Sequence, residues 1–259
     1  MAAVLSDRWT SARSRPLLLG HRGARHAAPE NTFAAFDLAL DEGAEGVEFD
    51  VRLNASGDVI VCHDVTLERV TEGRDRRAIH DLSSSDCSAV RLPGGERLPL
   101  LLDVMDWAKR RQACLNIELK ADGKQRRALV GAVSRLTRGR PNSGDWLISC
   151  FNALVVLAHR TLAPDVPSAW LIGSRWLASW PVLPSLGSVA IHPHESLVTA
   201  ASMSRWKAAG LRVHVWTVNN PSRARDLAKL GVDCLISDNP GALRSALEPA
   251  IRVADVDAR

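Results

Sequence analysis

The chain has 259 residues, of which 46% are hydrophobic and 24% charged, and its formal net charge at pH 7 is +4. This apolar content suffices for a folded core and excludes an intrinsically disordered chain, while the near balance of acidic and basic residues argues against nucleic acid as a partner. The N-terminal apolar run is too short for a signal peptide, and no stretch approaches the length needed to span a bilayer.

Short apolar strands alternate with amphipathic helices along the chain. The predicted strands are residues 17–20, 47–53, 59–63, 114–119, 146–150, 169–172, 189–192, 212–218 and 234–237. The predicted helices are residues 32–40, 100–111, 123–136, 153–162, 197–209 and 222–230, the first of them capped by Asn31 or Thr32. Repeated units of a strand followed by a helix predict a parallel sheet covered by helices.

Nine predicted strands are one too many for an eightfold barrel. Only residues 54–58 separate the second strand from the third, whereas a parallel crossover needs about a dozen or more residues. These two strands are therefore expected to form an antiparallel hairpin, which leaves eight for a (β/α)8 TIM barrel over residues 15–250, with a loose tail at 251–259. The hairpin would bring His63 back beside Glu48 and Asp50.

One polar segment, residues 64–97, interrupts the alternation. It contains a serine run and a Pro-Gly-Gly turn, and it shows no long periodic pattern. Because it follows His63 directly, we expect it to cap one side of the barrel mouth and to influence substrate choice. Its composition predicts that it adds little to the core.

Three carboxylates indicate a metal site. Glu48 and Asp50 are two residues apart on a strand, so their side chains point to the same face, and Glu118 ends another strand with the same alternation. Carboxylates that converge at a barrel mouth repel one another and need a cation. An oxygen-only set of ligands suits Mg²⁺ or Ca²⁺ rather than zinc, so a divalent metal ion is the expected cofactor.

Two histidines and two cations accompany these acids. His21 lies at the C-terminal end of the first strand, where barrel enzymes place their chemistry, and His63 ends the hairpin strand. Histidine titrates near neutrality and suits both general base and general acid, although the residues alone do not order the two roles. Arg22 and Lys120 are placed to bind phosphate oxygens, so the set fits metal-assisted phosphodiester hydrolysis.

The order of the motifs resembles the glycerophosphodiester phosphodiesterase family, from about residue 17 to residue 240. The motifs that carry the resemblance are His21-Arg22-Gly23, Pro29-Glu30-Asn31-Thr32, Glu48-Phe49-Asp50, His63-Asp64 and Glu118-Leu119-Lys120. The resemblance implies a TIM barrel with a small insertion subdomain at 64–97. It also implies metal-dependent hydrolysis of glycerophosphodiesters to sn-glycerol 3-phosphate and an alcohol, with His21 as base and His63 as acid.

Several residues have a structural alternative beside the functional one. Glu30 is placed to orient Arg22 or His21, and Trp216 either forms a wall of the site or packs in the core. Other candidates lie at predicted strand ends or in a loop: His192 and His194, expected at the rim, and Trp176 and Trp180, expected either to line the pocket or to pack on the barrel exterior.

Two further functions use the same residues. A lysophospholipase D-like enzyme would hydrolyse lysophospholipids and would need a long apolar groove. A barrel that binds phosphoesters without turnover would lack a histidine or a carboxylate, and none is missing here. We expect a small-molecule glycerophosphodiester as substrate, no nucleic acid partner and no stable membrane insertion. The odd number of cysteines, five without a close pair, predicts reduced core residues in a cytoplasmic protein.

Overall fold

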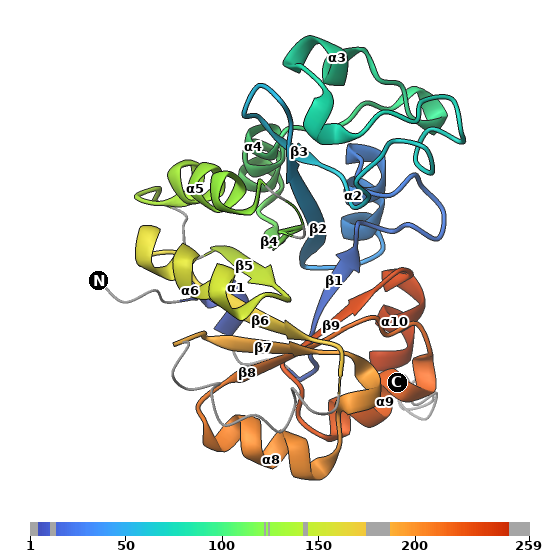
Figure 1. Cartoon of the computed structure of the whole chain (residues 1–259). Coiled ribbons are helices and arrows are strands. Elements are labelled where there is room, and N and C mark those ends of the chain that lie inside the picture. The colour runs from blue at the N-terminus through green and yellow to red at the C-terminus, as the bar shows by residue number, and fades with distance from the viewer. Residues whose placement is uncertain are drawn as a thin grey trace.

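A closed barrel of eight parallel strands forms the centre of the molecule (Figure 1). The computed structural model describes residues 5–10, 14–121, 123, 125–141, 145–174 and 187–248. The barrel closes because the first strand pairs with both the second and the last. These strands are β1 (Leu17–His21), β2 (Gly46–Leu53), β4 (Cys114–Leu119), β5 (Trp146–Cys150), β6 (Ser168–Ile172), β7 (Ala190–Pro193), β8 (Arg212–Val215) and β9 (Cys234–Ser237).

The hairpin predicted from the short second connection is present. β3 (Val59–Val61) runs antiparallel to β2, with Val51 opposite Val61 and Leu53 opposite Val59. Asn54 fixes the turn, because its side-chain oxygen accepts a hydrogen bond from the Asp58 amide at 2.8 Å. The prediction that this strand ends at His63 is wrong: β3 ends at Val61, and His63 lies two residues beyond it, directly before the segment at 64–97.

Helices surround the barrel, and most lie where the sequence predicted them (Figure 1). Thr32 caps the first of these helices through its hydroxyl, which accepts from the Ala35 amide at 3.2 Å. The major helices are α2 (Phe33–Asp41), α4 (Leu101–Arg111), α5 (Arg126–Thr137), α6 (Ala153–Leu162), α8 (Ala200–Ala208), α9 (Pro221–Lys229) and α10 (Pro240–Leu247). Short helical turns are α1 (Asp7–Thr10), η1 (Ile79–Asp81), α3 (Ser84–Ala89), η2 (Pro93–Gly95) and η5 (Glu195–Leu197).

The barrel interior is layered. Leu17 and Leu19 of β1 belong to an apolar cluster inside the barrel, and Trp9 of α1 joins it from the N-terminal side of the strands. Two buried histidines adjoin this cluster: the ring of His214 stacks on Trp9 at 5.4 Å, and its centroid is 4.8 Å from that of His192. The odd-numbered residues of β2 point outward instead and pack against the helices, as the alternation of a strand requires.

The placement of His192 at the rim is wrong. This side chain is fully buried within β7, where burial holds the pKa of its imidazole well below the usual value. The strand continues one residue beyond the predicted end, so His192 lies inside the barrel, and Nδ2 of Asn116 is 3.4 Å from its Nδ1. His194 does lie at the rim, with its ring against Trp216. The predicted positions of Trp176 and Trp180 fall outside the described residues.

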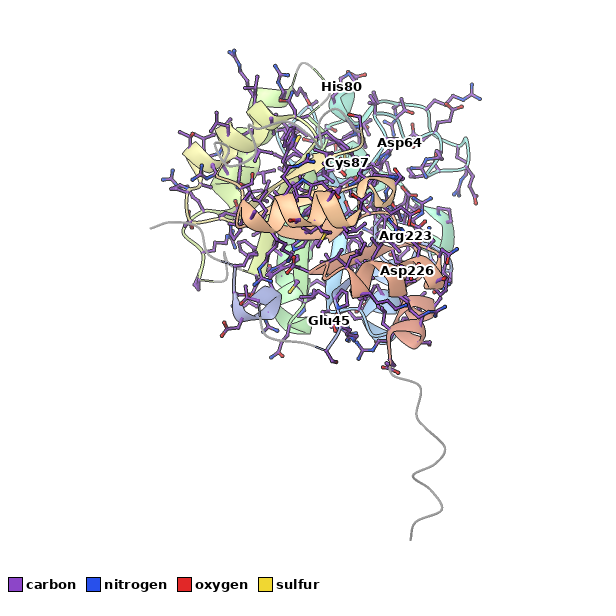
Figure 2. All side chains as sticks on the ribbon, turned by 90° about the horizontal axis from the view of Figure 1, so that it is seen from below. Glu45, Asp64, His80, Cys87, Arg223 and Asp226 are labelled. Carbon is purple, nitrogen blue, oxygen red and sulfur yellow. The ribbon has the colours of Figure 1, made fainter. Side chains whose placement is uncertain are left out.

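The segment after the hairpin, residues 64–97, has a small apolar core of its own, contrary to the expectation from its polar composition. Ile60 and Cys62 of the hairpin are part of this core, which also contains Leu67, Ile79, Leu82, Cys87, Val90, Leu92 and Leu98. Removing the segment would expose the hairpin residues as well. Figure 2 shows Asp64, His80 and Cys87 together in the upper part of the view, away from Glu45, which precedes β2.

All five cysteines are buried and form no disulfide, as predicted, so none is an exposed nucleophile. Burial raises the pKa of the Cys62 thiol to about 12, so this thiol is not a nucleophile activated by the neighbouring His63. Among the described residues, no helix combines the length and the apolar character that crossing a bilayer requires.

Candidate active site

Strand register brings the predicted acids and His21 to one level at the barrel mouth. His21 is paired in register with Glu48 across β1 and β2, and Asp50 with Glu118 across β2 and β4. Since residues two apart share a face of a strand, Glu48 and Asp50 both point into the barrel. One oxygen from each of the three carboxylates lies within 4.8 Å of the others. The structure thus brings together the three acids that the sequence assigned to a metal.

The three carboxylates are buried and affect one another electrostatically. Burial, together with repulsion from Asp50, raises the pKa of Glu48 well above its usual value and that of Glu118 to about 7. Burial also opposes ionisation of Asp50, but the charges of Lys120 and Arg22 outweigh it and hold the pKa of this carboxyl below its usual range. Three acids in one buried cluster therefore compete for two cationic side chains.

A divalent cation fits this set of donors. The cluster offers hard carboxylate oxygens at mutual distances suited to one ion, and its two cationic neighbours leave one negative charge uncompensated if all three acids ionise. Burial first, and repulsion from Asp50 second, raise the pKa of Glu118 to about 7 in the absence of a cation. Hard oxygen donors of this kind suit Mg²⁺ and Ca²⁺ alike, and the three side chains do not select between them.

Arg22 and Lys120 both contact Asp50. Nε of Arg22 is 3.1 Å from Oδ2 of Asp50, and Nη1 donates to Oε1 of Glu30 at 3.0 Å. Nζ of Lys120 is 3.0 Å from Oδ1 of Asp50 and also donates to Glu118. Glu30 thus orients Arg22, one of the two alternatives that the sequence left open. The Arg22 guanidinium has five N–H donors, so its contacts with Asp50 and Glu30 leave other donors for a phosphate.

A tight turn after β1 aims Arg22 at the acids. The backbone of Arg22 is left-handed, with φ 56°, and its amide donates to the Glu48 carbonyl at 2.7 Å. Gly23 follows with φ 83°, and a Cβ at that position would lie 2.6 Å from Ala35 of α2. Left-handed backbone at a side-chain-bearing residue is strained and persists where surrounding contacts hold it. Here the turn places the guanidinium beside Asp50.

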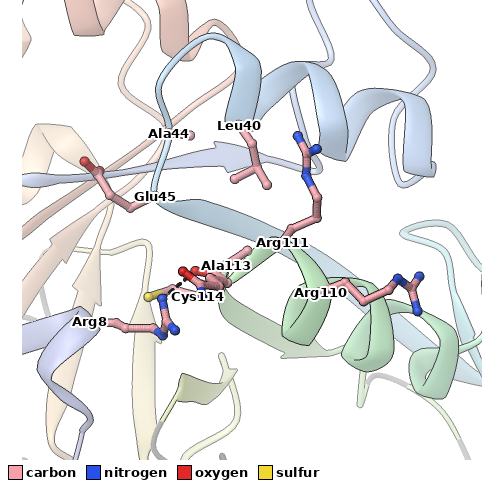
Figure 3. Close-up of a pocket in the computed structure, with 9 residues that line it drawn as sticks. Arg8, Leu40, Ala44, Glu45, Arg110, Arg111, Ala113 and Cys114 are labelled. Carbon is pink, nitrogen blue, oxygen red and sulfur yellow. Dashed lines mark hydrogen bonds between the residues drawn. The ribbon is translucent and has the colours of Figure 1, made fainter.

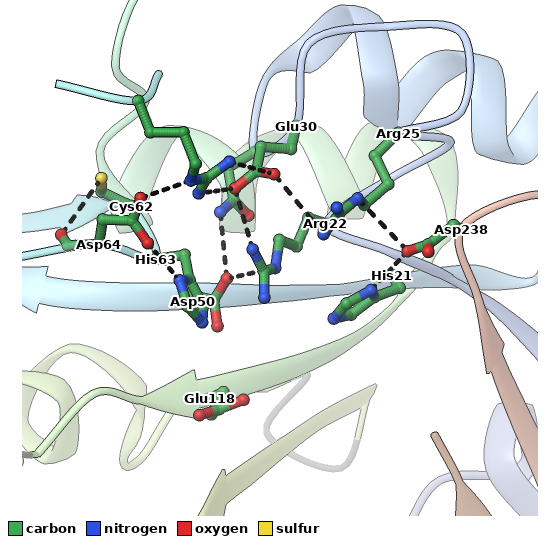
Figure 4. A network of polar contacts seen from close by, with 12 residues as sticks. His21, Arg22, Arg25, Glu30, Asp50, Cys62, His63, Asp64, Glu118 and Asp238 are labelled. Carbon is green, nitrogen blue, oxygen red and sulfur yellow. Dashed lines mark hydrogen bonds and ion pairs between the residues drawn. The ribbon is translucent and has the colours of Figure 1, made fainter. Parts of the chain in front are cut away.

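Each of the two histidines has a carboxylate on its Nδ1 atom (Figure 4). Nδ1 of His21 is 2.6 Å from Oδ1 of Asp238, and Nδ1 of His63 is 2.6 Å from Oδ1 of Asp64. A carboxylate on Nδ1 fixes the tautomer and the ring plane, and leaves Nε2 to exchange a proton with another group. Nε2 of His21 lies 3.9 Å from Oε2 of Glu48, so it faces the acid cluster.

The partner of His21 comes from the opposite end of the chain. Asp238 directly follows β9, and β9 pairs with β1 to close the barrel. Although burial opposes its ionisation, hydrogen bonds from His21 and Asn219 keep the pKa of Asp238 below its usual value. Sequence reasoning missed this residue. The available signal was its place directly after the last strand, next to the first strand of a closed barrel.

Arg69 joins the segment after the hairpin to the site, and it too was missed. Its two terminal nitrogens donate to the two oxygens of Glu30 at 2.9 and 2.7 Å, and its Nε donates to Oδ2 of Asp64 at 2.6 Å. Burial opposes ionisation of Asp64, but the bonds from Arg69 and His63 lower its pKa to about 2. Arg69 therefore fixes both the carboxylate that orients Arg22 and the one that orients His63. No sequence motif indicated this role of Arg69.

A cavity of about 320 Å³ opens over these groups. Its polar wall contains both histidines, Arg22, Glu48, Glu118 and Lys120. Its apolar wall contains Trp216, as the sequence suggested, and also Phe151, whose ring packs edge-on against Trp216 at 5.4 Å. The indole of Trp216 donates to the His192 carbonyl at 2.8 Å, which fixes this wall.

Comparison with known proteins identifies the family of the chain. The model of the glycerophosphoryl diester phosphodiesterase family matches residues 21–242. A glycerophosphodiester phosphodiesterase from Caldanaerobacter subterraneus subsp. tengcongensis is 26% identical over 236 residues, covering 88% of this chain and 96% of that protein.

Solved structures also share the fold. A phosphodiesterase from Oleispira antarctica in complex with the product sn-glycerol-3-phosphate has a TM-score of 0.80 and 27% identity, covering 91% of this chain and 98% of that chain. A glycerophosphodiester phosphodiesterase from Thermotoga maritima has a TM-score of 0.76 and 25% identity, covering 90% and 99%. The chain therefore belongs to the glycerophosphoryl diester phosphodiesterase family and is a phosphoric diester hydrolase.

Proposed function

We propose that the chain hydrolyses glycerophosphodiesters to sn-glycerol 3-phosphate and an alcohol, by general acid and base catalysis with two histidines and a divalent cation. One observation carries the proposal. A single cavity is lined by two imidazoles with carboxylate-bound Nδ1 atoms, by metal-type acids and by two cations: His21, His63, Glu48, Glu118, Arg22 and Lys120. The resemblance of the fold to an enzyme that holds sn-glycerol-3-phosphate as product supports the choice of substrate.

Arg22 and Lys120 would bind the substrate phosphate. The guanidinium offers a planar set of donors to two phosphate oxygens, and the ammonium adds a point charge. Glu48, Asp50 and Glu118 would hold the cation, which when bound polarises a phosphoryl oxygen. The protein's own contribution is to keep these charges in place before the reaction, as the contacts of both cations with Asp50 do.

His21 would act as general base and His63 as general acid. Nε2 of His21 takes the proton of the attacking hydroxyl, which belongs either to water or to the glycerol of the substrate. As the bond from phosphorus to the alcohol oxygen breaks, Nε2 of His63 supplies the proton that the leaving oxygen needs. Burial lowers the pKa of His63 in the free protein, and a bound anionic phosphate would raise it toward the protonated form that a general acid requires.

The test is release of sn-glycerol 3-phosphate from a panel of diesters. The panel contains glycerophosphodiesters with different alcohols and, as the competing class, long-chain lysophospholipids. We expect turnover of the glycerophosphodiesters and little of the lysophospholipids. The reverse preference would favour the lysophospholipase D-like function, and binding without turnover of any compound would favour the non-catalytic barrel.

Asp238 gives the catalytic assignment a separate test. We expect Asp238→Ala to lower kcat at least about tenfold, because the imidazole of His21 loses the group that fixes its tautomer. The limb of the pH profile that reports the base should shift, and Asp238→Asn, which keeps an acceptor oxygen, should recover part of the rate. Asp226→Ala on α9 is the control, since Asp226 lies at the surface and, among the described residues, forms an ion pair with Lys229 alone. An unchanged pH profile would remove Asp238 from a positioning role.

The proposal also covers the cellular compartment and the role of the segment at 64–97. The five buried thiols support a reducing compartment such as the cytoplasm. The segment at 64–97 begins beside His63 and reaches Glu30 through Arg69, which supports an influence of this subdomain on the cavity mouth and on substrate choice.

A further inference from the structure

Glu30 lies among three arginines beside the site. Arg22 donates to its Oε1, Arg69 donates to both of its oxygens, and Nη1 of Arg25 is 3.6 Å from its Oε2. Only 10% of the Glu30 side chain is exposed, so water screens these charges weakly. Burial opposes ionisation of this carboxyl, but the hydrogen bond from Arg69 and the charge of Arg22 keep its pKa below the usual value. Glu30 is thus one anion shared by three cations.

Arg69 extends from Glu30 to the carboxylate that holds the proposed general acid. Its two Nη atoms bind Glu30, and its Nε donates to Oδ2 of Asp64 at 2.6 Å. The other oxygen of Asp64, Oδ1, lies 2.6 Å from Nδ1 of His63. Both oxygens of Asp64 are therefore engaged, and the bond from Arg69 sets the direction in which this carboxylate meets the imidazole.

Arg25 makes the corresponding connection on the side of the proposed general base. Its Nη1 faces Glu30, and its Nε is 3.5 Å from Oδ1 of Asp238, the oxygen that lies 2.6 Å from Nδ1 of His21. Oδ2 of Asp238 accepts a hydrogen bond from Nδ2 of Asn219 at 2.7 Å. The contacts of Arg25 are longer than those of Arg69, so Arg25 restrains its carboxylate less strongly.

These contacts form one chain of alternating charges between the two histidines (Figure 4). We call this chain the arginine network: Asp64, Arg69, Glu30, Arg25 and Asp238. Its members come from three separate parts of the sequence, namely the loop after β1, the segment after the hairpin and the residue after β9. An isolated ion pair at a surface restrains its side chains little, whereas a network in which each carboxylate meets several donors restrains them more. The arginine network can therefore hold both imidazoles in a fixed relation to each other.

A comparable cluster at the opposite end of the barrel provides a structural reference. Glu45 lines a cavity of about 500 Å³ at the N-terminal ends of the strands (Figure 3). It pairs with Arg15 and, at 3.3 Å, with Arg244 of α10, and it accepts a hydrogen bond from the Leu18 amide at 2.8 Å. These contacts join α10 and β1 to the residue before β2. Removal of an arginine here tests the loss of an ion pair far from the catalytic histidines.

We propose that Arg69 and Arg25 are positioning residues, each of which orients one of the two catalytic histidines. Arg69 holds the general acid through Asp64. Arg25 holds the general base through Asp238. The inference rests on the proposed function and adds the groups that keep both proton-transfer residues in place from one shared carboxylate, Glu30.

The leaving group of the substrate separates the two roles. A general acid is needed when the alcohol would otherwise leave as an alkoxide, and it is nearly dispensable when the leaving group is nitrophenolate, which is a stable anion. A general base is needed in both cases, because it acts on the attacking hydroxyl. Since both substrates carry the same phosphate, any loss of affinity through Arg22 affects them alike and cancels in the ratio of their kcat/KM values.

The test compares kcat/KM for the ethyl and the 4-nitrophenyl esters of sn-glycerol 3-phosphate. In Arg69→Ala we expect a fall of about tenfold or more for the ethyl ester and of no more than about twofold for the nitrophenyl ester. Arg69→Lys, which keeps the charge but loses the fork that reaches two carboxylates, should recover part of the loss. In Arg25→Ala both values should fall by the same factor, about threefold, because its contacts are longer. Arg244→Ala is the matched control and should leave the ratio of the two values unchanged.

The ¹⁵N chemical shifts of the imidazoles report the same positions without relying on turnover. At a pH at which the rings are neutral, a carboxylate on Nδ1 favours the tautomer that carries its proton there. Arg69→Ala should move the shifts of His63 toward the mixture of tautomers of a free imidazole and leave those of His21 in place. Arg25→Ala should do the reverse.

The outcomes separate the inference from the proposed function. Equal losses for the two esters in Arg69→Ala, with His63→Ala still sensitive to the leaving group, would overturn the inference and leave the proposed function intact. If His63→Ala is itself insensitive to the leaving group, its role as acid fails, and if neither ester is hydrolysed, the proposed function fails. In both of these cases the tautomer shifts decide the inference, which unchanged shifts in Arg69→Ala and Arg25→Ala would contradict.

Discussion

The His21→Ala and His63→Ala variants are each expected to lose at least about two orders of magnitude in kcat, the usual scale for a positioned general acid or base. A carboxylate oxygen 2.6 Å from Nδ1 holds each imidazole in position. Another side chain that moved into the vacated space would lack this orientation and would not restore the rate. Affinity for a phosphodiester should change less, because the proposed ligands of the phosphate are Arg22 and Lys120. The measurements are kcat and a dissociation constant for each variant.

The pH dependence of kcat/KM shows which histidine is the general base and which is the general acid. Wild-type kcat/KM should be bell-shaped, and the limb that reports the base should be lost in the variant that lacks the base. Loss of this limb in His63→Ala rather than His21→Ala would exchange the proposed roles. Near wild-type turnover in either variant would remove that histidine from the mechanism. Thermal unfolding of both proteins controls for the carboxylate that each substitution leaves without its imidazole.

Removal of divalent cations with EDTA is expected to abolish activity, and their addition should stabilise the fold in a pH-dependent way. Burial raises the pKa of Glu48 and Glu118 above their unfolded values. The metal-free protein therefore binds these protons more tightly when folded, and the stability that the Glu118 proton contributes is present below about pH 4.5 and is lost as pH rises through about 7. A cation replaces the protons, and its stabilisation should grow over that range.

The readout is the shift in Tm on adding Mg²⁺ or Ca²⁺ at about pH 5.5 and about pH 8. At a cation concentration of about 100 times Kd, we expect a shift of about 5 °C or more at the higher pH and a smaller one at the lower pH. Glu118→Gln should abolish this shift, and in EDTA at about pH 8 it should melt above the wild type. Activity that survives thorough chelation, or an unchanged shift in Glu118→Gln, would contradict the metal assignment.

The sequence predicted the barrel because loop length and strand alternation act locally. Five residues between two strands allow only a hairpin, and β2 and β3 form one. Alternation also placed Glu48 and Asp50 on one face, and strand register then brought Glu118 level with Asp50. These features follow from the geometry of single strands and short connections, which the order of residues determines directly.

The parts that were missed depend on contacts between distant segments. Asp238 reaches His21 only because β9 docks on β1, which no local pattern reports. His192 looked like a rim residue because a one-residue change in a strand end decides between mouth and interior. The core of the segment at 64–97 was missed because its apolar residues are spaced irregularly, as packing without long helices or strands permits.

The pairing of β9 with β1 has a consequence for how the protein matures. The three acids and both cations lie within the first 120 residues, whereas His21 acquires its partner only when the last strand docks. A chain emerging from the ribosome would thus contain the residues of the acid cluster well before Asp238 is synthesised. The proposed site would be complete only once the barrel has closed, because the carboxylate that holds Nδ1 of His21 arrives with the last strand.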